Sequence, residues 1–265
     1  MFRENKKHMI IGVLSGFLNG LFGSGGGSLF VPAAEKFINL EEKKAHATAI
    51  ALILPLTILS AFIYIPKTEV PWKMVIFLIA GGLLGGYTGA ILLNRLSGKV
   101  IHIVFGIFML IAAYSVIKRG FSPQTSTGYT QGIFDLSGIL ILWVIFTGFI
   151  SGIISGMGIG GGTILIPALL IFFSLSQKQS QAVNLIYFIP TAIIAIFKHK
   201  KNNQIEKTIL KPIIITGLIG SAIGSLIALN TENNVLKIMF GFFLGFMGIR
   251  EILISRGKGN SKNGI

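Results

Sequence analysis

The sequence predicts an all-α polytopic membrane protein made of two homologous four-segment repeats, each opening with a segment that a glycine-rich break interrupts. Hydrophobic residues make up 52% of the 265 residues and charged residues only 12%, and the mean hydropathy is +0.78. Apolar stretches of the roughly 20 residues that a bilayer span needs fill most of the chain. Two of these stretches contain a break, at residues 23–28 and 158–163. This composition excludes an ordinary soluble domain.

Eight apolar segments are expected. They cover residues 9–36, 46–65, 72–93, 100–117, 138–173, 182–197, 210–229 and 235–254. The first and the fifth contain the breaks and are followed closely by Pro32 and Pro167. Lipid offers no hydrogen bonds, so backbone can leave helical form at membrane depth only where protein or a water-filled cavity satisfies it. Breaks at matching positions of two halves therefore predict a binding site.

A constant offset relates the two halves. Adding 135 carries Gly25, Gly26 and Gly27 onto Gly160, Gly161 and Gly162, Pro32 onto Pro167, Pro55 onto Pro190, and Gly82, Gly85 and Gly89 onto Gly217, Gly220 and Gly224. Upstream of the breaks the offset is 132, which matches Gly20 to Gly152. The sequence thus predicts a first repeat at residues 1–119, a polar linker at 120–132, and a second repeat with a basic tail at 133–265.

The orientation of the repeats has two readings. If the broken segments cross the membrane fully, the repeats are parallel and 16 of the 23 Lys and Arg residues lie on the side of the N-terminus. If each is a re-entrant hairpin, the repeats are inverted and the number is 17 of 23. Both readings satisfy the positive-inside rule. The length of residues 9–36 favours the hairpin, since one crossing needs fewer residues at about 1.5 Å each.

Charge and composition exclude several function classes. The net charge of +14 lies mainly in short loops and at the C-terminus, which predicts cytoplasmic termini and argues against nucleic-acid binding. The chain has no cysteine, and so no thiol nucleophile and no thiolate-held cofactor. No phosphate-binding Gly-x-x-x-x-Gly-Lys motif appears, so we expect no ATP drive and no cofactor.

The breaks have the features of an anion cradle. Glycines let the backbone approach a ligand closely, and a helix that begins just afterwards presents unpaired N–H groups at its positive end. No Asp, Glu, Lys or Arg lies in the middle of an apolar segment, which argues against a cation substrate. The expected binding residues are Ser24, Gly25, Gly26, Gly27, Ser28, Gly160, Gly161, Gly162 and Thr163, with Asn19, Ser151 and Ser155 as further donors. The alternative is that Gly and Ser only permit close helix packing.

These residues also carry a resemblance to a known family. The run Gly16-Phe17-Leu18-Asn19-Gly20-Leu21-Phe22-Gly23-Ser24-Gly25-Gly26-Gly27, then Val31-Pro32 and Ala45-His46-Ala47-Thr48, resembles the sulfite exporter TauE/SafE family, as does the second copy from Gly148 to Pro167 with Gln181-Ala182-Val183-Asn184. The resemblance covers residues 9–254. It implies a prokaryotic inner-membrane permease for small sulfur-containing or carboxylate anions. The chain departs from the common pattern at Ala49, where many relatives carry a polar residue.

Further residues are candidates with two readings each. Thr48 and Asn184 are expected to begin the helices that follow the broken segments, as caps or as substrate ligands. His46 is a candidate for a coupling proton, although its counterpart is Gln181. Pro55 and Pro190 are expected to kink their helices, either as hinges or to set shape. Tyr187 is a further polar candidate. A stripe of Gly82, Gly85, Gly86 and Gly89, with Gly217, Gly220 and Gly224, is assigned to helix packing.

The function that these patterns predict is a secondary carrier for a small anion in the lipid bilayer, working by alternating access between the repeats, with no enzyme activity and no metal ligands. An anion channel is the main alternative, because half-helices with positive ends can also line a pore. An intramembrane serine protease with Ser24 as nucleophile and His46 as base is a weaker alternative. The oligomeric state, the coupling ion and the direction of flow stay open.

Overall fold

The computed structural model describes residues 2–24, 26–95, 98–121, 138–158 and 160–260, and over these residues the chain is helical with no strand. The α-helices are α1 (Phe2–Phe22), α2 (Gly26–Ala33), α3 (Glu42–Tyr64), α4 (Trp72–Arg95), α5 (Gly98–Phe121), α7 (Gly138–Gly156), α8 (Gly162–Phe172), α9 (Gln177–Lys201), α10 (Leu210–Asn230) and α11 (Asn233–Asn260). A π-helical turn, Ala34–Ile38, extends α2, and a 3₁₀ turn, Ile65–Lys67, follows α3. The all-α fold class is confirmed.

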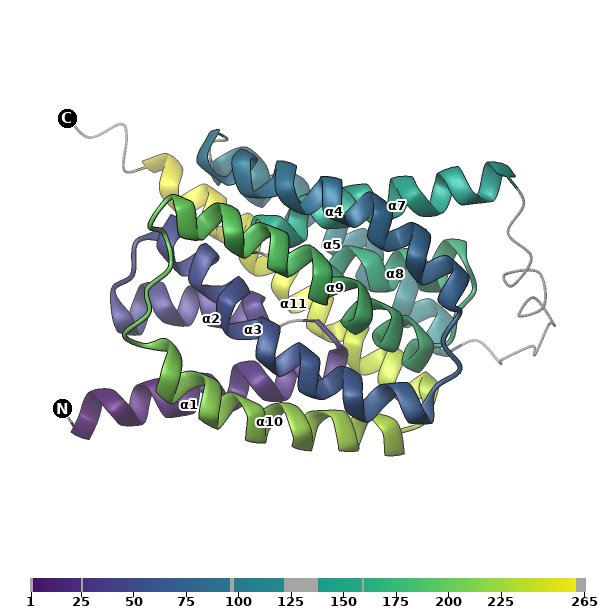
Figure 1. The fold of residues 1–265 in the computed structure, drawn as a ribbon, viewed down its shortest axis with the longest axis horizontal. Helices are drawn as coiled ribbons and strands as arrows, with labels where there is room; N and C mark the ends of the chain where they lie inside the picture. The colour runs from purple at the N-terminus through teal and green to yellow at the C-terminus, as the bar shows by residue number, and fades with distance from the viewer. Residues whose placement is uncertain (1, 25, 96–97, 122–137, 159, 261–265) are drawn as a thin grey trace.

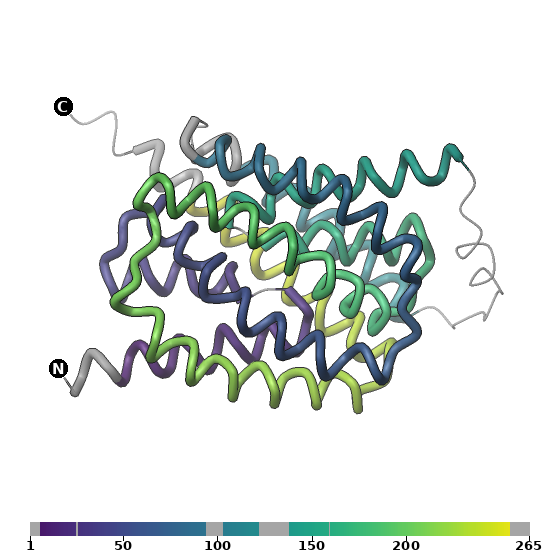
Figure 2. The backbone as a smooth tube through the Cα atoms, in the orientation of Figure 1, coloured from purple at the N-terminus to yellow at the C-terminus, as the bar shows by residue number. Residues whose placement is uncertain are grey.

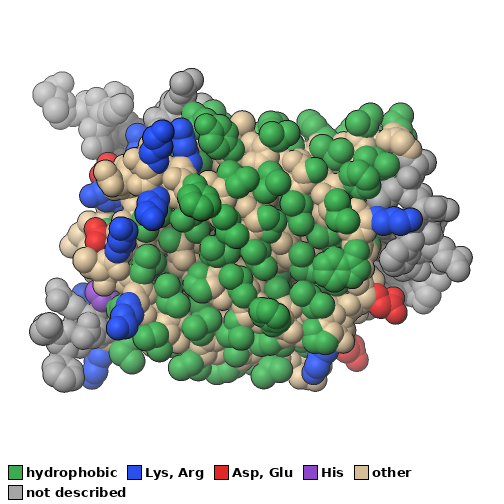
Figure 3. All heavy atoms as spheres, in the orientation of Figure 1, with side chains coloured by type: hydrophobic (Ala, Val, Ile, Leu, Met, Phe, Trp, Pro, Cys, Tyr) green, Lys and Arg blue, Asp and Glu red, His purple; other side chains and the backbone are tan. Residues whose placement is uncertain are grey.

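Six of the described helices are long and apolar enough to cross a membrane. They are α3, α4, α5, α7, α9 and α10, which correspond to six of the eight expected segments. On the face shown in Figure 3, hydrophobic side chains cover the middle of the molecule, and most Lys and Arg side chains gather at the end where α1 begins. This distribution of apolar and basic side chains is the one expected of a multi-pass membrane protein.

Each broken segment folds back on itself. In Figure 1, α1 runs inward from the end that carries the N-terminus, and α2 returns to that same end; α7 and α8 do the same from the opposite end of the molecule. α2 packs on α1 and α8 packs on α7. The sequence left open whether each broken segment crosses fully or forms a hairpin. In the structure both broken segments are hairpins. The path of the tube in Figure 2 therefore crosses the molecule along α3, α4, α5, α9, α10 and α11, and α11 ends where α1 begins.

The two halves interleave. α1 lies along α10, α7 lies along α4, α5 lies along α11, and α3 contacts α9. Each of these pairs joins the first half of the chain to the second. One hydrophobic cluster contains buried residues of both halves, among them Leu21, Tyr64, Leu165, Leu185 and Phe240. The repeat boundaries stay a prediction, and residues 122–132 of the proposed linker lie outside the described residues.

Glycines allow the closest of these contacts, as predicted from the glycine stripe in the sequence. A Cβ atom built on Gly85 would come closer than 3.0 Å to the carbonyl oxygen of Phe149 on α7, and one on Gly224 would do the same to Phe17 on α1. Gly82 and Gly86 instead face α9, where Tyr187 and Thr191 lie. Without water to expel, helices in lipid associate by such close packing. The assignment of the stripe to helix contact is confirmed.

Gly85→Ala is expected to destabilise the folded protein, whereas Gly245→Ala is not. The added methyl group at Gly85 meets the Phe149 carbonyl, and overpacking of this kind costs about 1–3 kcal/mol. At Gly245 the nearest atom, Cβ of Ala113, lies at an ordinary 3.7 Å. Thermal unfolding in detergent measures both, with a fall of roughly 2–4 °C per kcal/mol for a chain of this size. Equal midpoints for the two variants would contradict the glycine-mediated contact.

Candidate functional site

Glycines with positive φ stand at both breaks. They are Gly23 (φ +68°), Gly158 (φ +80°) and Gly160 (φ +101°). L side chains rarely adopt this conformation, whereas glycine adopts it without steric cost. Both predicted breaks are therefore present, but they are shorter than predicted, because α2 begins at Gly26 and α8 at Gly162, inside the ranges 23–28 and 158–163. Gly25, predicted as a binding residue, lies outside the described residues.

The two breaks touch each other and also the helix that follows the opposite break. A Cβ atom on Gly27 would lie 3.2 Å from the carbonyl oxygen of Gly158. A Cβ atom built on Gly23 would lie 3.0 Å from Cβ of Gln181 on α9, and one built on Gly158 would collide with the backbone of His46 on α3. The offset of 135 carries Gly23 onto Gly158 and His46 onto Gln181, so the two contacts are equivalent. The repeat itself stays a prediction.

Polar side chains surround the start of α8. The hydroxyl oxygen of Ser24 lies 2.7 Å from the position that a Cβ of Gly162 would take. Asn184 reaches the same position from α9, and its Nδ2 donates a hydrogen bond of 2.6 Å to the carbonyl oxygen of Gly23. We call this place the break junction. It consists of Ser24, Gly26, Gly27, Ser155, Gly158, Gly160, Gly161, Gly162 and Asn184.

Several buried polar atoms at the break junction have no hydrogen-bond partner among the described residues. They are the hydroxyl oxygens of Ser24 and Ser155 and Oδ1 of Asn184. These side chains are only 5%, 2% and 2% exposed. An unsatisfied buried donor or acceptor costs about 1–3 kcal/mol. A polar ligand at the junction would supply the missing partners, and the positive ends of α2 and α8 favour a negative charge on it.

Two other predicted donors form hydrogen bonds to the backbone of the second break. The hydroxyl of Ser151 donates to the carbonyl oxygen of Gly161 (2.9 Å), and that of Thr163 donates to Gly160 (2.7 Å). A hydroxyl has one hydrogen to donate, so in this conformation both are engaged with backbone. Their contact with a substrate stays a prediction.

Thr48 and Asn184 do not begin their helices, so the expectation that they are helix caps is wrong. α3 begins at Glu42, and α9 has Ser176 as its N-cap, with its side chain accepting from the Gln179 N–H. Both helices start earlier than expected because polar residues before the apolar run form regular first turns. The hydroxyl oxygen of Thr48 accepts a hydrogen bond from the backbone N–H of Glu206 at 3.0 Å. Thr48 thus ties α3 to the loop before α10, and its role as a substrate ligand stays a prediction.

Other candidates lie in the surrounding core. Nδ2 of Asn19 donates to the hydroxyl of Thr57 at 3.3 Å, and the hydroxyl of Tyr187 donates to the carbonyl oxygen of Gly148 at 2.5 Å. Pro55 and Pro190 lie inside α3 and α9, as predicted. Their role as hinges stays a prediction.

His46 lies in a group that the sequence reading missed. One imidazole nitrogen of His46 and carboxylate oxygens of Glu35 and Glu42 lie within 4.8 Å of one another. These are ligand types that hold divalent cations or exchange protons. The spacing of four residues from Glu42 to His46, which puts both on one helix face, was the available signal.

A small cavity leads from the break junction to the same group. It is lined by Gly27, Ser28, Val31, Pro32, Glu35, His46, Arg250 and Glu251. Ser28, predicted as a binding residue, is buried there at 6% exposure. Arg250 and Glu251 lie on α11.

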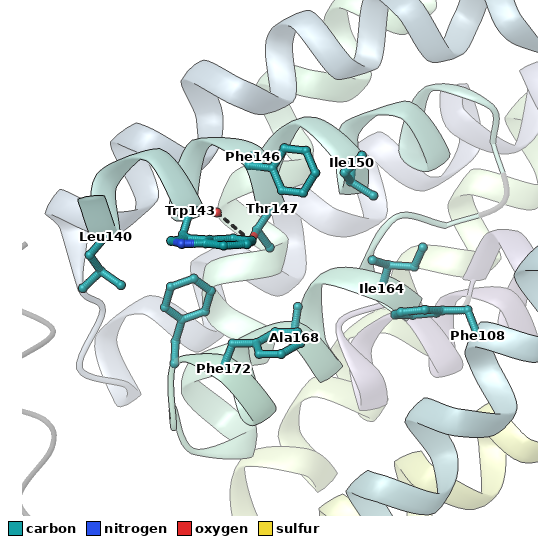
Figure 4. A pocket seen from close by; sticks show the side chains of 10 residues that line it. Phe108, Leu140, Trp143, Phe146, Thr147, Ile150, Ile164, Ala168 and Phe172 are labelled. Carbon is teal, nitrogen blue, oxygen red and sulfur yellow. Dashed lines mark hydrogen bonds between the residues drawn. The ribbon is translucent and has the colours of Figure 1, made fainter. Parts of the chain in front are cut away.

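A cavity of 620 Å³ elsewhere offers nothing to an anion. Figure 4 shows Trp143 and Phe146 of α7 facing Ala168 and Phe172 of α8 across it. Its one hydroxyl, on Thr147, donates to the carbonyl oxygen of Trp143 at 2.8 Å. This cavity is therefore apolar and separate from the break junction.

Comparisons with known proteins agree with the fold. A family model described as sulfite exporter TauE/SafE matches residues 3–116 and 140–264. The "probable membrane transporter protein YunE" of Bacillus subtilis (strain 168) is 21% identical over 92% of this chain and 96% of its own length. A "probable membrane transporter protein" of Methanocaldococcus jannaschii is 26% identical over 92% and 94%, and one of Xylella fastidiosa (strain 9a5c) is 23% identical over 88% and 89%. No solved structure gives a significant match.

Gly158→Ala is expected to destabilise the protein more than Gly160→Ala. Both residues have positive φ, which costs about 1–3 kcal/mol for other residues. A methyl group at Gly158 would also collide with the His46 carbonyl, whereas at Gly160 the nearest atom is the Ser24 hydroxyl oxygen at 3.9 Å. Thermal unfolding of the two variants measures the difference. Equal losses of stability in the two variants would contradict the close contact between Gly158 and His46.

Proposed function

Because the chain belongs to the sulfite exporter TauE/SafE family of membrane transporters, we propose that it is a secondary carrier that exports a small anion, such as sulfite, an organosulfonate or a related carboxylate. The observation that carries the proposal is the break junction. Two helix starts meet there beside buried side chains that lack partners among the described residues.

The electrostatics of the junction suit an anion. None of the residues that form it is Asp, Glu, Lys or Arg. Each helix start carries about half a positive charge. Backbone dipoles can bind a dehydrated anion in this way without a cationic side chain that would hold it too tightly for release.

The burial of the junction favours a carrier working by alternating access. Ser24, Ser155 and Asn184 are almost inaccessible, so the site is closed to both sides in this conformation. The α1–α2 and α7–α8 hairpins reach the junction from opposite ends of the molecule. We propose that movement of one hairpin against the other opens the site to one side at a time, with Pro55 and Pro190 as hinges and His46 as the coupling group.

The enzyme alternative lacks its central contact. A serine nucleophile needs a base within hydrogen-bond reach. The Ser24 hydroxyl has no hydrogen-bond partner among the described residues, and the His46 imidazole lies with Glu35 and Glu42. The family also points to transport. A channel remains distinguishable by experiment, since it would give large single-channel currents and no counterflow.

Wild-type protein in proteoliposomes is expected to accumulate trace labelled anion by counterflow when loaded with sulfite, thiosulfate, sulfoacetate or acetate in turn. Gly26→Leu and Gly161→Leu should abolish this transport. A Cβ atom added at these positions would lie only 2.8 and 2.6 Å from the carbonyl oxygens of Ser15 and Ser151, so the larger side chain displaces the backbone of the junction. Membrane insertion and monodispersity are measured alongside, with Gly245→Leu as the control. Unchanged transport in either junction variant would refute the assignment of the site.

We propose that the end carrying the start of α1, the end of α11 and most of the described Lys and Arg side chains on the face in Figure 3 is cytoplasmic. The cysteine-free chain allows a direct test with single-cysteine variants. In intact cells a membrane-impermeant maleimide should label Lys67→Cys, after α3, and not Lys207→Cys, before α10. Both should react after permeabilisation. The reverse pattern in intact cells would contradict this topology.

A further inference from the structure

Two carboxylates and an imidazole meet where α2 ends and α3 begins. Glu35 lies in the π-helical turn that extends α2, and Glu42 lies in the first turn of α3. His46 follows Glu42 by one helical turn, so the two lie on one face of α3. One ligand atom of each of the three side chains lies within 4.8 Å of the other two. The fold thus brings metal-binding groups of two helices to one place, apart from the break junction.

The three side chains are of the types that bind divalent transition metals. Imidazole nitrogen and carboxylate oxygen bind Zn²⁺ at about 2.0–2.2 Å, so two ligands of one ion lie at most about 4.4 Å apart. Separations within 4.8 Å therefore need only small rotations of the two glutamate side chains. Three protein ligands would leave the fourth position of a tetrahedral ion to water.

A cavity beside these side chains has room for one water molecule or one ion. Its volume is about 20 Å³, and its lining includes Ser28, Glu35, His46 and Glu251. A space of this size holds one water-sized particle. His46 is only 6% exposed, whereas Glu35 and Glu42 are half-buried. The two carboxylates therefore offer an entry path from solvent to the buried imidazole, which a metal site requires.

The charges around the cavity favour a divalent cation. Glu35, Glu42 and Glu251 contribute three carboxylates, and Arg250 contributes one guanidinium group. The guanidinium Nη1 donates to Oε1 of Glu251 at 3.1 Å. With a neutral imidazole the carboxylates exceed the cations by two charges, which one divalent ion balances. The lysines nearest in the chain are exposed to solvent, which screens their charge. They are Lys36, Lys43 and Lys44.

We propose that Glu35, Glu42 and His46 bind one divalent transition-metal cation, with Zn²⁺ as the best-fitting ion, and that the bound ion links the end of α2 to the start of α3. One nitrogen and two oxygens suit Zn²⁺, whereas Mg²⁺ and Ca²⁺ prefer oxygen ligands alone. This site departs from the expectation drawn from the sequence, which was of no metal ligands.

Equilibrium binding of radioactive Zn²⁺ tests the site on the full-length protein, purified in detergent without a polyhistidine tag. Near neutral pH the imidazole is available as a ligand and the carboxylates are ionised. One Zn²⁺ per chain should bind saturably at micromolar concentration. His46→Gln should raise the Kd at least tenfold, since loss of even an outer-shell partner costs about 10- to 100-fold. His8→Gln removes a half-buried histidine of α1 and should leave the Kd unchanged.

A second variant keeps the test valid if His46→Gln fails to fold. Glu42→Gln changes a half-buried side chain and should also raise the Kd at least tenfold. Glu232→Gln, at an exposed carboxylate, is its matched control. Zn²⁺ at 100 times its Kd should raise the thermal midpoint of the wild-type protein by roughly 5–10 °C. Absence of saturable binding, or a Kd that neither site variant changes, would overturn the site.

The bound ion should also affect the proposed carrier, and this consequence rests on the proposed function. α2 belongs to the α1–α2 hairpin, whose movement is proposed to open the site. Saturating Zn²⁺ should therefore slow counterflow by the wild-type protein and slow it less in Glu42→Gln. Unchanged counterflow by Zn²⁺-saturated wild-type protein would overturn the link between α2 and α3. Absence of counterflow without Zn²⁺ would overturn the proposed function, whereas the binding measurement needs no transport.

Discussion

Close backbone contact between helices of opposite halves is the constraint on which the structure depends. α1 and α7 are parts of hairpins and do not cross the molecule, so each needs a full-length neighbour. Glycines bring α1 against α10 and α7 against α4 so closely that a Cβ atom at Gly85 or Gly224 would collide with a carbonyl group. In lipid, where apolar burial drives association only weakly, this packing supplies the attraction. It places both hairpin tips at one junction.

The second requirement is satisfaction of the backbone where the helices end. The carbonyl groups around the two breaks accept hydrogen bonds from side chains of α3, α7, α8 and α9. The pairs are Tyr64 with Gly20, Asn184 with Gly23, Tyr187 with Gly148, His199 with Gly156, Ser151 with Gly161 and Thr163 with Gly160. Tyr64 and His199 each donate to a carbonyl in the last turns of the helix that precedes a break, Gly20 in α1 and Gly156 in α7. The breaks are thus held firmly, as backbone at membrane depth must be.

The hydrogen bonds that hold the breaks leave few polar groups to contact a ligand at the break junction. Most polar groups near the breaks form hydrogen bonds to the backbone, whereas the hydroxyls of Ser15, Ser24 and Ser155 and the amide oxygen of Asn184 have no hydrogen-bond partner among the described residues. The proposed anion would therefore contact a small set of side chains in defined positions and two helix starts. The carboxylates and the His46 imidazole lie apart, along the small cavity that leads toward one end.

The sequence by itself determined the membrane class, the positions of both breaks, the packing role of the glycine stripe and the family. These follow from local properties: apolar length, the freedom of glycine at positive φ, and motif spacing. Tertiary structure alone decided that the broken segments are hairpins and that Glu35, Glu42 and His46 come together. It also decided that Thr163 and Ser151 donate to the break whereas Ser24 does not. The reason is physical: which of these groups meet depends on where the chain turns between helices and on how the helices then pack, and the pattern within a single helix does not specify either.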